Sequence, residues 1–225
     1  MADRRALCLV NGGLEEISTA DRLILPGDPL FDLHPASKQY VDRLVLHISS
    51  SGNSLFAKGV LEAGHRFNNN ELAGPSGQLW LSYVTALTNT PITKLAVNIG
   101  NTAAVGTTLA RLAFFTVASD NSITKVAQTA NDPTIGANAY NVNERVLSTV
   151  GGLPASYTPV PGTRYALGYL HVATTTPPVS GAYVIDPYAE PVPNRVIGGQ
   201  TDIAANYAVA DINPHYFMVW MSARP

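Results

Sequence analysis

The stretch "LARLAFFTVASDNSITKVAQT", residues 109–129, decides the fold of this chain. Its first nine residues are a nearly uninterrupted apolar run, which is typical of a central strand buried on both faces. The polar residues Ser119–Ser122 that follow have the composition of a tight turn. The segment "ITKVAQT" then returns from this turn. The stretch therefore predicts an antiparallel hairpin.

Other segments extend the same pattern in both directions. In "LWLSYVT", residues 79–85, alternation places Leu79, Leu81 and Tyr83 on one face of a strand. Three more segments are predicted strands: "ITKLAVNI" (92–99), "RYALGYLHVA" (164–173) and the closing "HYFMVWMS" (215–222). Gly, Pro, Asn and Asp separate these segments. The pattern predicts a mainly β domain over residues 51–225, an antiparallel β-sandwich with a jelly roll as the favoured form.

Charge marks off the N-terminal segment from this β domain. Residues 1–50 hold five basic and seven acidic side chains, whereas the remaining 175 residues hold eighteen. The stretch "SSSGNS", residues 49–54, has the composition of a linker between the two. Within the first segment, "RALCLVNGGLEEI" predicts a hairpin or an extended arm with its turn at Asn11-Gly12-Gly13.

One short helix is predicted over about residues 35–48. Pro35 suits the first helical position, and the apolar residues recur at three- and four-residue spacing. The predicted contact residues of this helix are Tyr40, Val41, Leu44, Val45 and Ile48. A helix of about four turns is marginal alone in water, so its apolar stripe needs a partner. That partner is either the chain's own β domain or other copies of the helix around a symmetry axis.

The run "LILPGDPLFDLHPASKQYVDRLV" resembles a segment of bacteriophage tail-fibre and minor tail proteins that introduces a fibre or head domain. The matching residues are Asp28, Pro29, His34, Ala36, Lys38, Gln39, Tyr40, Val41 and Asp42. Ser37 stands where that segment usually has Thr. The resemblance implies a homotrimer that attaches to other virion proteins through residues 1–50, and it favours the bundle of helices.

Residues 79–173 resemble a β-sandwich domain of minor tail or appendage proteins from phages of actinobacteria. The resemblance rests on "GQLWLSYVTALTNTPITKLAVNIGNTAA", "LARLAFFTVASDNSITKVAQTAND" and "PGTRYALGYLHVA". It implies a structural virion protein at the tail tip or in a fibre-like appendage. Capsid decoration is the alternative location, and a carbohydrate-active enzyme acting on cell-wall glycan is the alternative of another class.

Composition narrows the classes of function. A net charge of −2 and a pI of about 6.2 provide no basic field for nucleic acid. No apolar run is long enough to predict membrane insertion. Cys8 is the single cysteine, so an intrachain disulfide is excluded. Neither HExxH nor GxSxG occurs, and no cofactor is expected, so the favoured interpretation is a protein that is not an enzyme.

Carboxylates and tyrosines in loops are the remaining candidates for function. Asp120 and Asp132 favour backbone capping of turns over a loop calcium site. Tyr165 and Tyr169 lie in a predicted strand, whereas four tyrosines lie in predicted loops: Tyr157, Tyr183, Tyr188 and Tyr207. The proline-rich segment 174–193 combines the candidate surface contacts Tyr183, Asp186, Tyr188 and Glu190. An exposed tyrosine can stack on a host glycan or pack against another virion protein, and the charge-poor surroundings favour assembly.

Overall fold

The computed structural model describes residues 7–10, 13–16, 61–63, 70–183 and 194–225. The chain forms two compact units, Met1–Ile48 and Ser49–Pro225. In the first, β1 (Leu7–Val10) and β2 (Gly13–Glu16) pair as an antiparallel hairpin, so this prediction is confirmed. The predicted helix 35–48 lies outside the described residues, and with it Tyr40, Val41, Leu44, Val45 and Ile48.

The described part of the second unit is built from β-strands with two short 3-10 turns, η1 (Val150–Gly152) and η2 (Val209–Asp211). Its strands are β3 (Leu61–Ala63), β4 (Asn70–Leu72), β5 (Gln78–Thr85), β6 (Lys94–Asn98), β7 (Leu109–Val117), β8 (Ile123–Gln128), β9 (Val142–Val146), β10 (Arg164–Val172), β11 (Val179–Tyr183), β12 (Asn194–Ile197), β13 (Asn206–Tyr207), β14 (Asn213–Pro214), β15 (Phe217–Val219) and β16 (Met221–Arg224). Every named pairing is antiparallel, for example β10 with both β5 and β7. The prediction of a mainly β, antiparallel domain is confirmed.

The hairpin predicted from residues 109–129 is β7 and β8. The two strands pair directly, with a register shift between Phe114 and Phe115. Their turn uses Asn121 at φ 67°, a left-handed conformation that asparagine tolerates better than most residues. Asp120 caps the same turn, because its Oδ1 accepts hydrogen bonds from the backbone N–H and the hydroxyl of Ser122. The capping interpretation of Asp120 is therefore confirmed.

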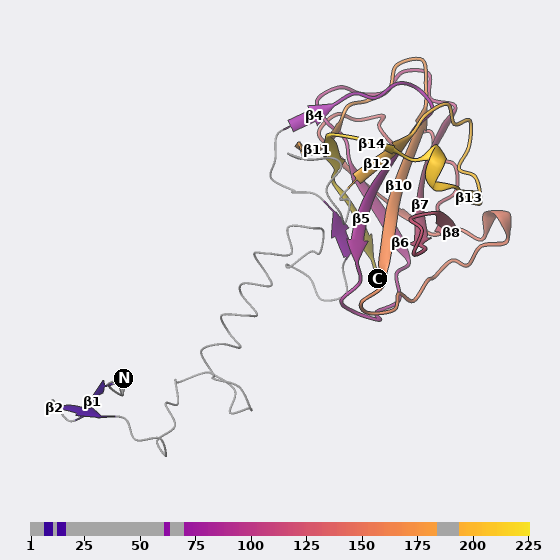
Figure 1. Cartoon of the computed structure of the whole chain (residues 1–225). Coiled ribbons are helices and arrows are strands. Elements are labelled where there is room, and N and C mark those ends of the chain that lie inside the picture. The colour runs from indigo at the N-terminus through magenta and orange to yellow at the C-terminus, as the bar shows by residue number, and fades with distance from the viewer. Residues whose placement is uncertain (1–6, 11–12, 17–60, 64–69, 184–193) are drawn as a thin grey trace. The chain divides into compact units, whose positions relative to one another are not determined.

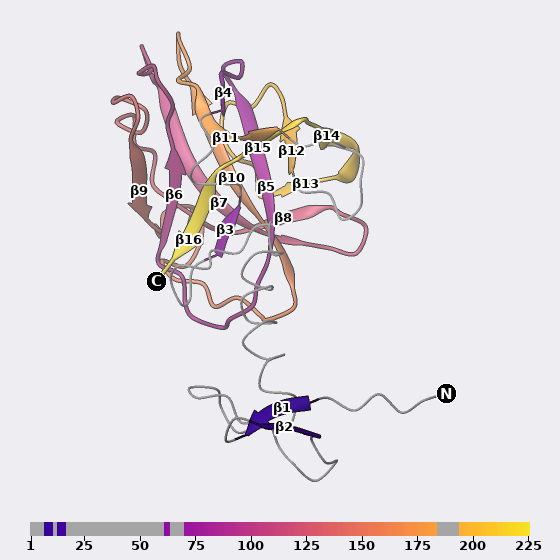
Figure 2. The same ribbon diagram turned by 90° about the vertical axis from the view of Figure 1, so that its left-hand side faces the viewer.

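Three sheets curl around one core as a half-barrel (Figures 1 and 2). The largest has seven strands in the order β13-β8-β7-β10-β5-β12-β14, and the others are β3-β16-β6-β9 and β15-β11-β4. A bridge between Thr129 and Leu147 joins the end of β8, in the seven-stranded sheet, to the end of β9, in the four-stranded sheet. A bridge between Ile99 and Val179 joins the four-stranded sheet to the three-stranded sheet. The predicted closing strand is divided at Trp220, because β15 and β16 belong to different sheets.

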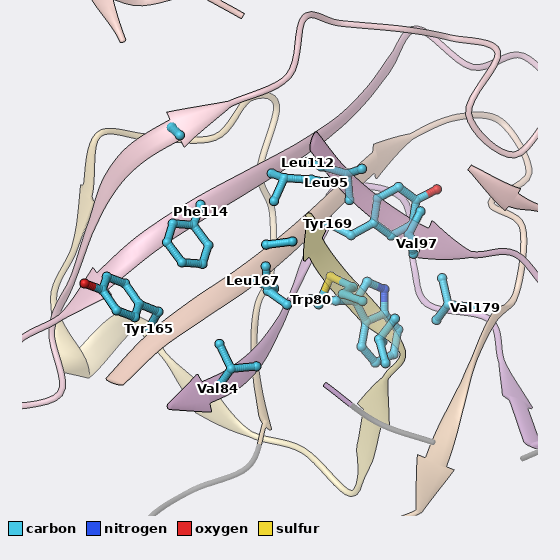
Figure 3. Close-up of a cluster of buried hydrophobic side chains, with 14 of the residues drawn as sticks. Trp80, Val84, Leu95, Val97, Leu112, Phe114, Tyr165, Leu167, Tyr169 and Val179 are labelled. Carbon is cyan, nitrogen blue, oxygen red and sulfur yellow. The ribbon is translucent and has the colours of Figure 1, made fainter. Parts of the chain in front are cut away.

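The first core lies on the face of the seven-stranded sheet that the other two sheets cover (Figure 3). Phe114 of β7 stacks on Tyr165 of β10 with ring centroids 4.9 Å apart, and Tyr157 packs against both rings. Tyr165 and Tyr169 are each 1% exposed, as their place in a strand predicted. The alternate residues of the same strands are therefore free to face a second core.

The second core covers the opposite face of the seven-stranded sheet and includes Leu79, Leu81 and Tyr83, the predicted shared face of β5. Residues 198–214 cover this core. They follow β12 in the chain and pair with β8, through β13, at the far edge of the sheet. They then return to pair with β12 through β14. This segment supplies Ile203, Tyr207 and Ile212 to the core. Below them, Gly168 of β10 makes room for Phe115, because a Cβ there would lie 2.7 Å from the phenyl ring.

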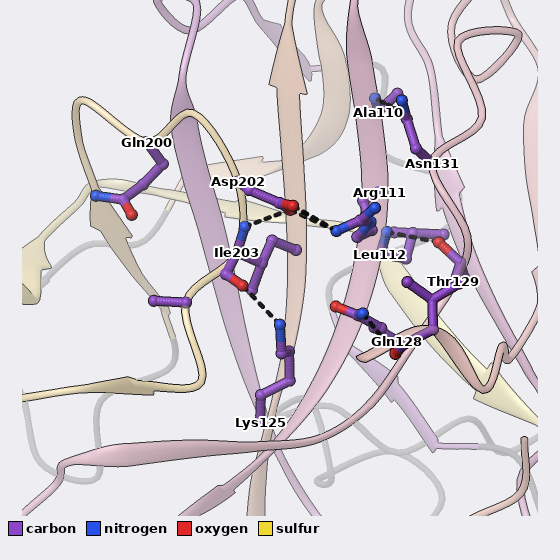
Figure 4. Close-up of polar contacts among 12 residues, drawn as sticks. Ala110, Arg111, Leu112, Lys125, Gln128, Thr129, Asn131, Gln200, Asp202 and Ile203 are labelled. Atoms are coloured by element: carbon purple, nitrogen blue, oxygen red, sulfur yellow. Dashed lines mark hydrogen bonds and ion pairs between the residues drawn. The ribbon is translucent and has the colours of Figure 1, made fainter. Parts of the chain in front are cut away.

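Polar contacts fasten this covering segment to the sheet (Figure 4). Arg111 of β7 donates from Nη1 to both carboxylate oxygens of Asp202, at 2.5 and 2.7 Å. Lys125 of β8 donates from Nζ to the carbonyl of Ile203 at 2.6 Å, and burial lowers the pKa of this lysine. Both contacts satisfy groups that would otherwise lose water without a partner.

Candidate functional site

Three loops meet at one end of the second unit. Because neighbouring strands are antiparallel, the chain turns at this end after β6, after β8 and after β10 (Figure 2). The loops are residues 99–108, 132–141 and 173–178, which we call the three-loop platform. The C-terminus lies toward the opposite end (Figure 2).

Main-chain hydrogen bonds hold the three loops side by side. Between the first two loops, Ala104 N donates to Gly136 O and Tyr140 N donates to Gly100 O, each at 2.7 Å. Val105 and Thr175 exchange two hydrogen bonds of 3.0 Å between the first and third loops. The platform thus continues the hydrogen-bonding of a sheet beyond the strand ends, which limits the motion of each loop.

A buried polar chain supports the platform from below. His171, at the end of β10, is 4% exposed and contacts the Tyr169 hydroxyl through Nδ1 and the Thr107 hydroxyl through Nε2, the latter at 2.8 Å. Burial lowers the pKa of His171 to about 4 and raises the pKa of Tyr169. The histidine is therefore neutral near pH 7, when one ring nitrogen donates and the other accepts. Gly136 packs on this histidine, since a Cβ there would lie 3.1 Å from His171 Cε1.

A second polar group fixes the start of the middle loop. Asp132 Oδ1 accepts hydrogen bonds from the backbone N–H of Thr134, at 2.8 Å, and from its hydroxyl. Asp132 Oδ2 accepts a hydrogen bond from Arg145 Nε of β9. The hydrogen bonds from Thr134 and Arg145 outweigh burial and lower the pKa of Asp132. The capping interpretation of this aspartate is confirmed.

The upper surface of the platform carries one exposed aromatic residue, Tyr140. This residue is 76% exposed, and its φ is 51°. Beside it, Ile99 N donates to Asn141 O at 3.0 Å, so backbone hydrogen bonds lie at Tyr140 and at the next residue. The strained conformation is thus imposed by the loop pairing.

Uncharged polar residues flank this tyrosine in its own loop and in the loop that pairs with it. Residues 99–108, 133–143 and 173–183 contain no Asp, Glu, Lys or Arg. Exposed residues of the platform include Asn101, Thr102, Asn138, Asn141, Thr174 and Thr175. Glu71 of β4 directs its carboxylate at the first loop, where Oε2 accepts a hydrogen bond from Asn101 N at 2.9 Å. The platform offers amides, hydroxyls and one aromatic face.

Of the predicted surface contacts, the structure describes Tyr183. It ends β11 with its side chain 57% exposed and its ring edge against Phe217, with centroids 5.1 Å apart. Asp186, Tyr188 and Glu190 lie outside the described residues, so their proposed contact stays a prediction.

Two other tyrosines predicted in loops pack against the cores: Tyr157 is partly buried, and Tyr207 is a core residue. Tyr157 packs on the first core, where burial raises its pKa to about 12. Tyr207 is 6% exposed in the second core, and its hydroxyl accepts a hydrogen bond from Ala204 N and donates to Gln200. Flanking prolines and alanines gave no indication of this packing, because Phe114 and Phe115, which lie against Tyr157 and Tyr207, are distant in sequence.

Sequence reasoning missed Tyr140. The signal available was "GANAYNVN", residues 136–143, a tyrosine between asparagines in a stretch without charge. Its positive φ could not be predicted, because the strain arises from pairing with Gly100, some forty residues earlier.

Comparisons with known proteins add no relative: no family model matches the chain, and no curated protein matches it. Among the described residues, no group of three or more His, Cys, Asp and Glu side chains is placed to hold a metal ion. In the same part of the chain, no helix has the length and apolar character needed to cross a membrane.

Proposed function

We propose that this protein is a structural component of a bacteriophage virion, a minor tail, tail-tip or fibre-like appendage protein. One observation carries the proposal: a segment that resembles a virion attachment motif, "HPASKQYVD", precedes an antiparallel β unit whose loops are tied together at one end. Loops displayed on a rigid β scaffold suit contacts with other molecules. The β unit is proposed to be a sandwich of the jelly-roll type.

In this proposal residues 1–50 attach the protein to the particle and associate its copies. Three copies of the helix 35–48 would bury Val41 and Leu44 along the trimer axis. A carboxylate placed there has no partner and is costly to bury. Val41→Asp or Leu44→Asp should therefore release monomers in light scattering, whereas Asp42→Ser, which lies off the apolar stripe, should leave a trimer. A trimer in both stripe variants would show that the helix is not the contact.

The location is tested on purified particles of the phage that encodes the chain. Antibodies against the full chain should place gold label at the tail tip in electron micrographs. Label on the capsid instead would support a capsid decoration protein, the alternative location. Particles without label, from lysates that contain the protein, would overturn the proposal.

The alternative function, a carbohydrate-active enzyme, is tested separately. A carbohydrate-active enzyme releases reducing sugar from host cell-wall polysaccharide, and a binding protein does not. Three of the described carboxylates favour the binding protein, because Asp132 and Asp202 are ion-paired to arginines and Asp120 caps a turn. Release of sugar by the purified chain would overturn the structural role.

A further inference from the structure

Tyr140 has an unfavourable backbone conformation, and packing of its own side chain does not offset that cost. A left-handed conformation is unfavourable for a residue with a Cβ, and a bulky side chain there is uncommon. Aromatic residues usually offset such costs by burial, but Tyr140 is 76% exposed. Strained residues of this kind persist where the surrounding structure enforces them and are concentrated at binding sites.

The loops around Tyr140 are ordered before any ligand arrives. Tyr140 N bonds to Gly100 O and Ala104 N to Gly136 O, while Val105 and Thr175 tie the third loop to the first. Below them, His171 joins Thr107 of the first loop to Tyr169 of β10. A site that is fixed in advance loses little conformational entropy on binding, so a few weak contacts suffice for measurable affinity.

The chemistry of the platform restricts the class of ligand. The three loops have no charged side chain beyond Asp132, which is paired with Arg145, and the one carboxylate that reaches the first loop, Glu71, accepts a hydrogen bond from Asn101 N, so the platform provides no counter-charge for an anion. Asn101 and Thr102 follow Gly100, the backbone partner of Tyr140, and Asn141 follows Tyr140 itself. Amide and hydroxyl groups near an exposed aromatic ring match a ligand with many hydroxyls and an apolar face.

We propose that Tyr140, with Asn101, Thr102 and Asn141, forms a binding site for a neutral saccharide. The tyrosine ring stacks on the C–H face of one sugar ring. The amides and the threonine hydroxyl exchange hydrogen bonds with the hydroxyls of the sugar. The site deepens the proposed function and rests on it for the biological target, a glycan of the host surface, but the binding itself is a property of the isolated chain.

The test applies the full chain to an array of neutral and acidic oligosaccharides, and then measures the affinity for the strongest neutral oligosaccharide by calorimetry. We expect binding to a neutral member. Tyr140→Gly should lower this affinity by about tenfold, the order of one aromatic stacking contact. Tyr140→Phe keeps the ring and should retain most of the affinity, and Tyr216→Ala, which removes an exposed tyrosine outside the platform, should leave it unchanged.

Thermal melting provides the second measurement. Glycine adopts a positive φ without strain, so Tyr140→Gly should melt at the same or a higher temperature than the original chain. A lower melting temperature would assign the ring a structural contact and overturn the proposal. It is equally overturned if no neutral oligosaccharide binds, if acidic ones alone bind, or if Tyr140→Gly binds normally. None of these outcomes bears on the labelling of particles, so the virion role stands or fails independently.

Discussion

The two faces of the seven-stranded sheet are both buried, but different kinds of structure cover them. The first face packs against two other sheets, so strands lie on both sides of its core. The second face packs against residues 198–214, a segment with two short strand contacts and a single 3-10 turn. Strands are held by ladders of hydrogen bonds, whereas this segment is held by two-residue strand pairings, single backbone hydrogen bonds and side-chain contacts such as Arg111 with Asp202. From this comparison we expect the core on the first face to be rigid and the core on the second face to be more adaptable.

Adjacent residues of β7 give the largest test of this difference. Phe114 faces the first core and Phe115 the second, and each is 0% exposed. Truncating a buried phenylalanine to alanine typically costs about 3–5 kcal/mol, and the cost depends on how far the surroundings can collapse. We expect Phe114→Ala to lower the free energy of unfolding by an amount in this range, and Phe115→Ala to lower it by less, because residues 198–214 can settle into the cavity.

Urea denaturation of the two variants measures both values under the same conditions. Thr124→Ala, an exposed position on β8, is the control and should change stability by less than about 0.5 kcal/mol. An equal or greater loss for Phe115→Ala would show that the covering segment is as rigid as the sheets.

The ion pair that fastens the second cover gives a smaller effect. Arg111 has a side chain 10% exposed, whereas Asp202 is 53% exposed. Asp202→Asn leaves the guanidinium without its charged partner, and solvent near the aspartate reduces the loss, so we expect about 1–2 kcal/mol. Asp211→Asn, in the same segment but at an exposed turn, should cost less than Asp202→Asn.

High salt tests how much charge contributes to the contact of Arg111 with Asp202, because screening weakens an ion pair that is partly exposed. The difference in urea midpoint between the original chain and Asp202→Asn should therefore shrink in 1 M sodium chloride. The loss from Phe114→Ala should not shrink in the same way, because no charge is involved. A difference unaffected by salt would mean that Asp202 acts mainly through its hydrogen bond from Ile203 N.

The sequence was sufficient to predict the hairpin of β7 and β8, because an apolar run, a polar turn and a returning segment are local signals. It also placed Leu79, Leu81 and Tyr83 on one face of β5. It could not predict that residues 198–214 cover that face. In "GGQTDIAANYAVADINP" the buried residues Ile203, Tyr207 and Ile212 are spaced by four and then five residues, so together they sustain neither a strand period nor a helix period.

The candidate site was harder to predict than the fold for the same reason. Each loop of the platform has an ordinary turn composition, and the site exists only because strand pairing brings three loops to one end. Tyr183 was predicted to lie at the surface, and it is exposed. The pattern that indicated it was a proline-rich segment, and Tyr140 lies in no such segment. Strain at a residue is a property of its distant partners, so single-sequence patterns do not contain it.

His171 provides a test by pH, one that the first face should show and the second should not. Burial lowers the pKa of His171 from an ordinary value of 6.5 to about 4. The unfolded chain therefore takes up a proton near pH 6.5 that the folded chain takes up only near pH 4, so folding stability should fall as pH falls through this window and level off below it. The described groups that hydrogen-bond to the ring are the hydroxyls of Tyr169 and Thr107, and burial raises the pKa of Tyr169, so neither supplies a compensating charge. Asp132 has a pKa lowered from 3.8, so its protonation affects stability below this pH window. Burial also lowers the pKa of His215, so a variant is needed to isolate the contribution of His171.

His171→Gln should be less stable at pH 7, because glutamine fits the two hydroxyls less well. Its stability should nevertheless fall less than that of the original chain between pH 6.5 and 4.5 in urea denaturation. Asp202→Asn, on the second face, should keep the original pH dependence in this window. Equal slopes for His171→Gln and the original chain would mean that the platform rests on a histidine that already takes up its proton in the folded state.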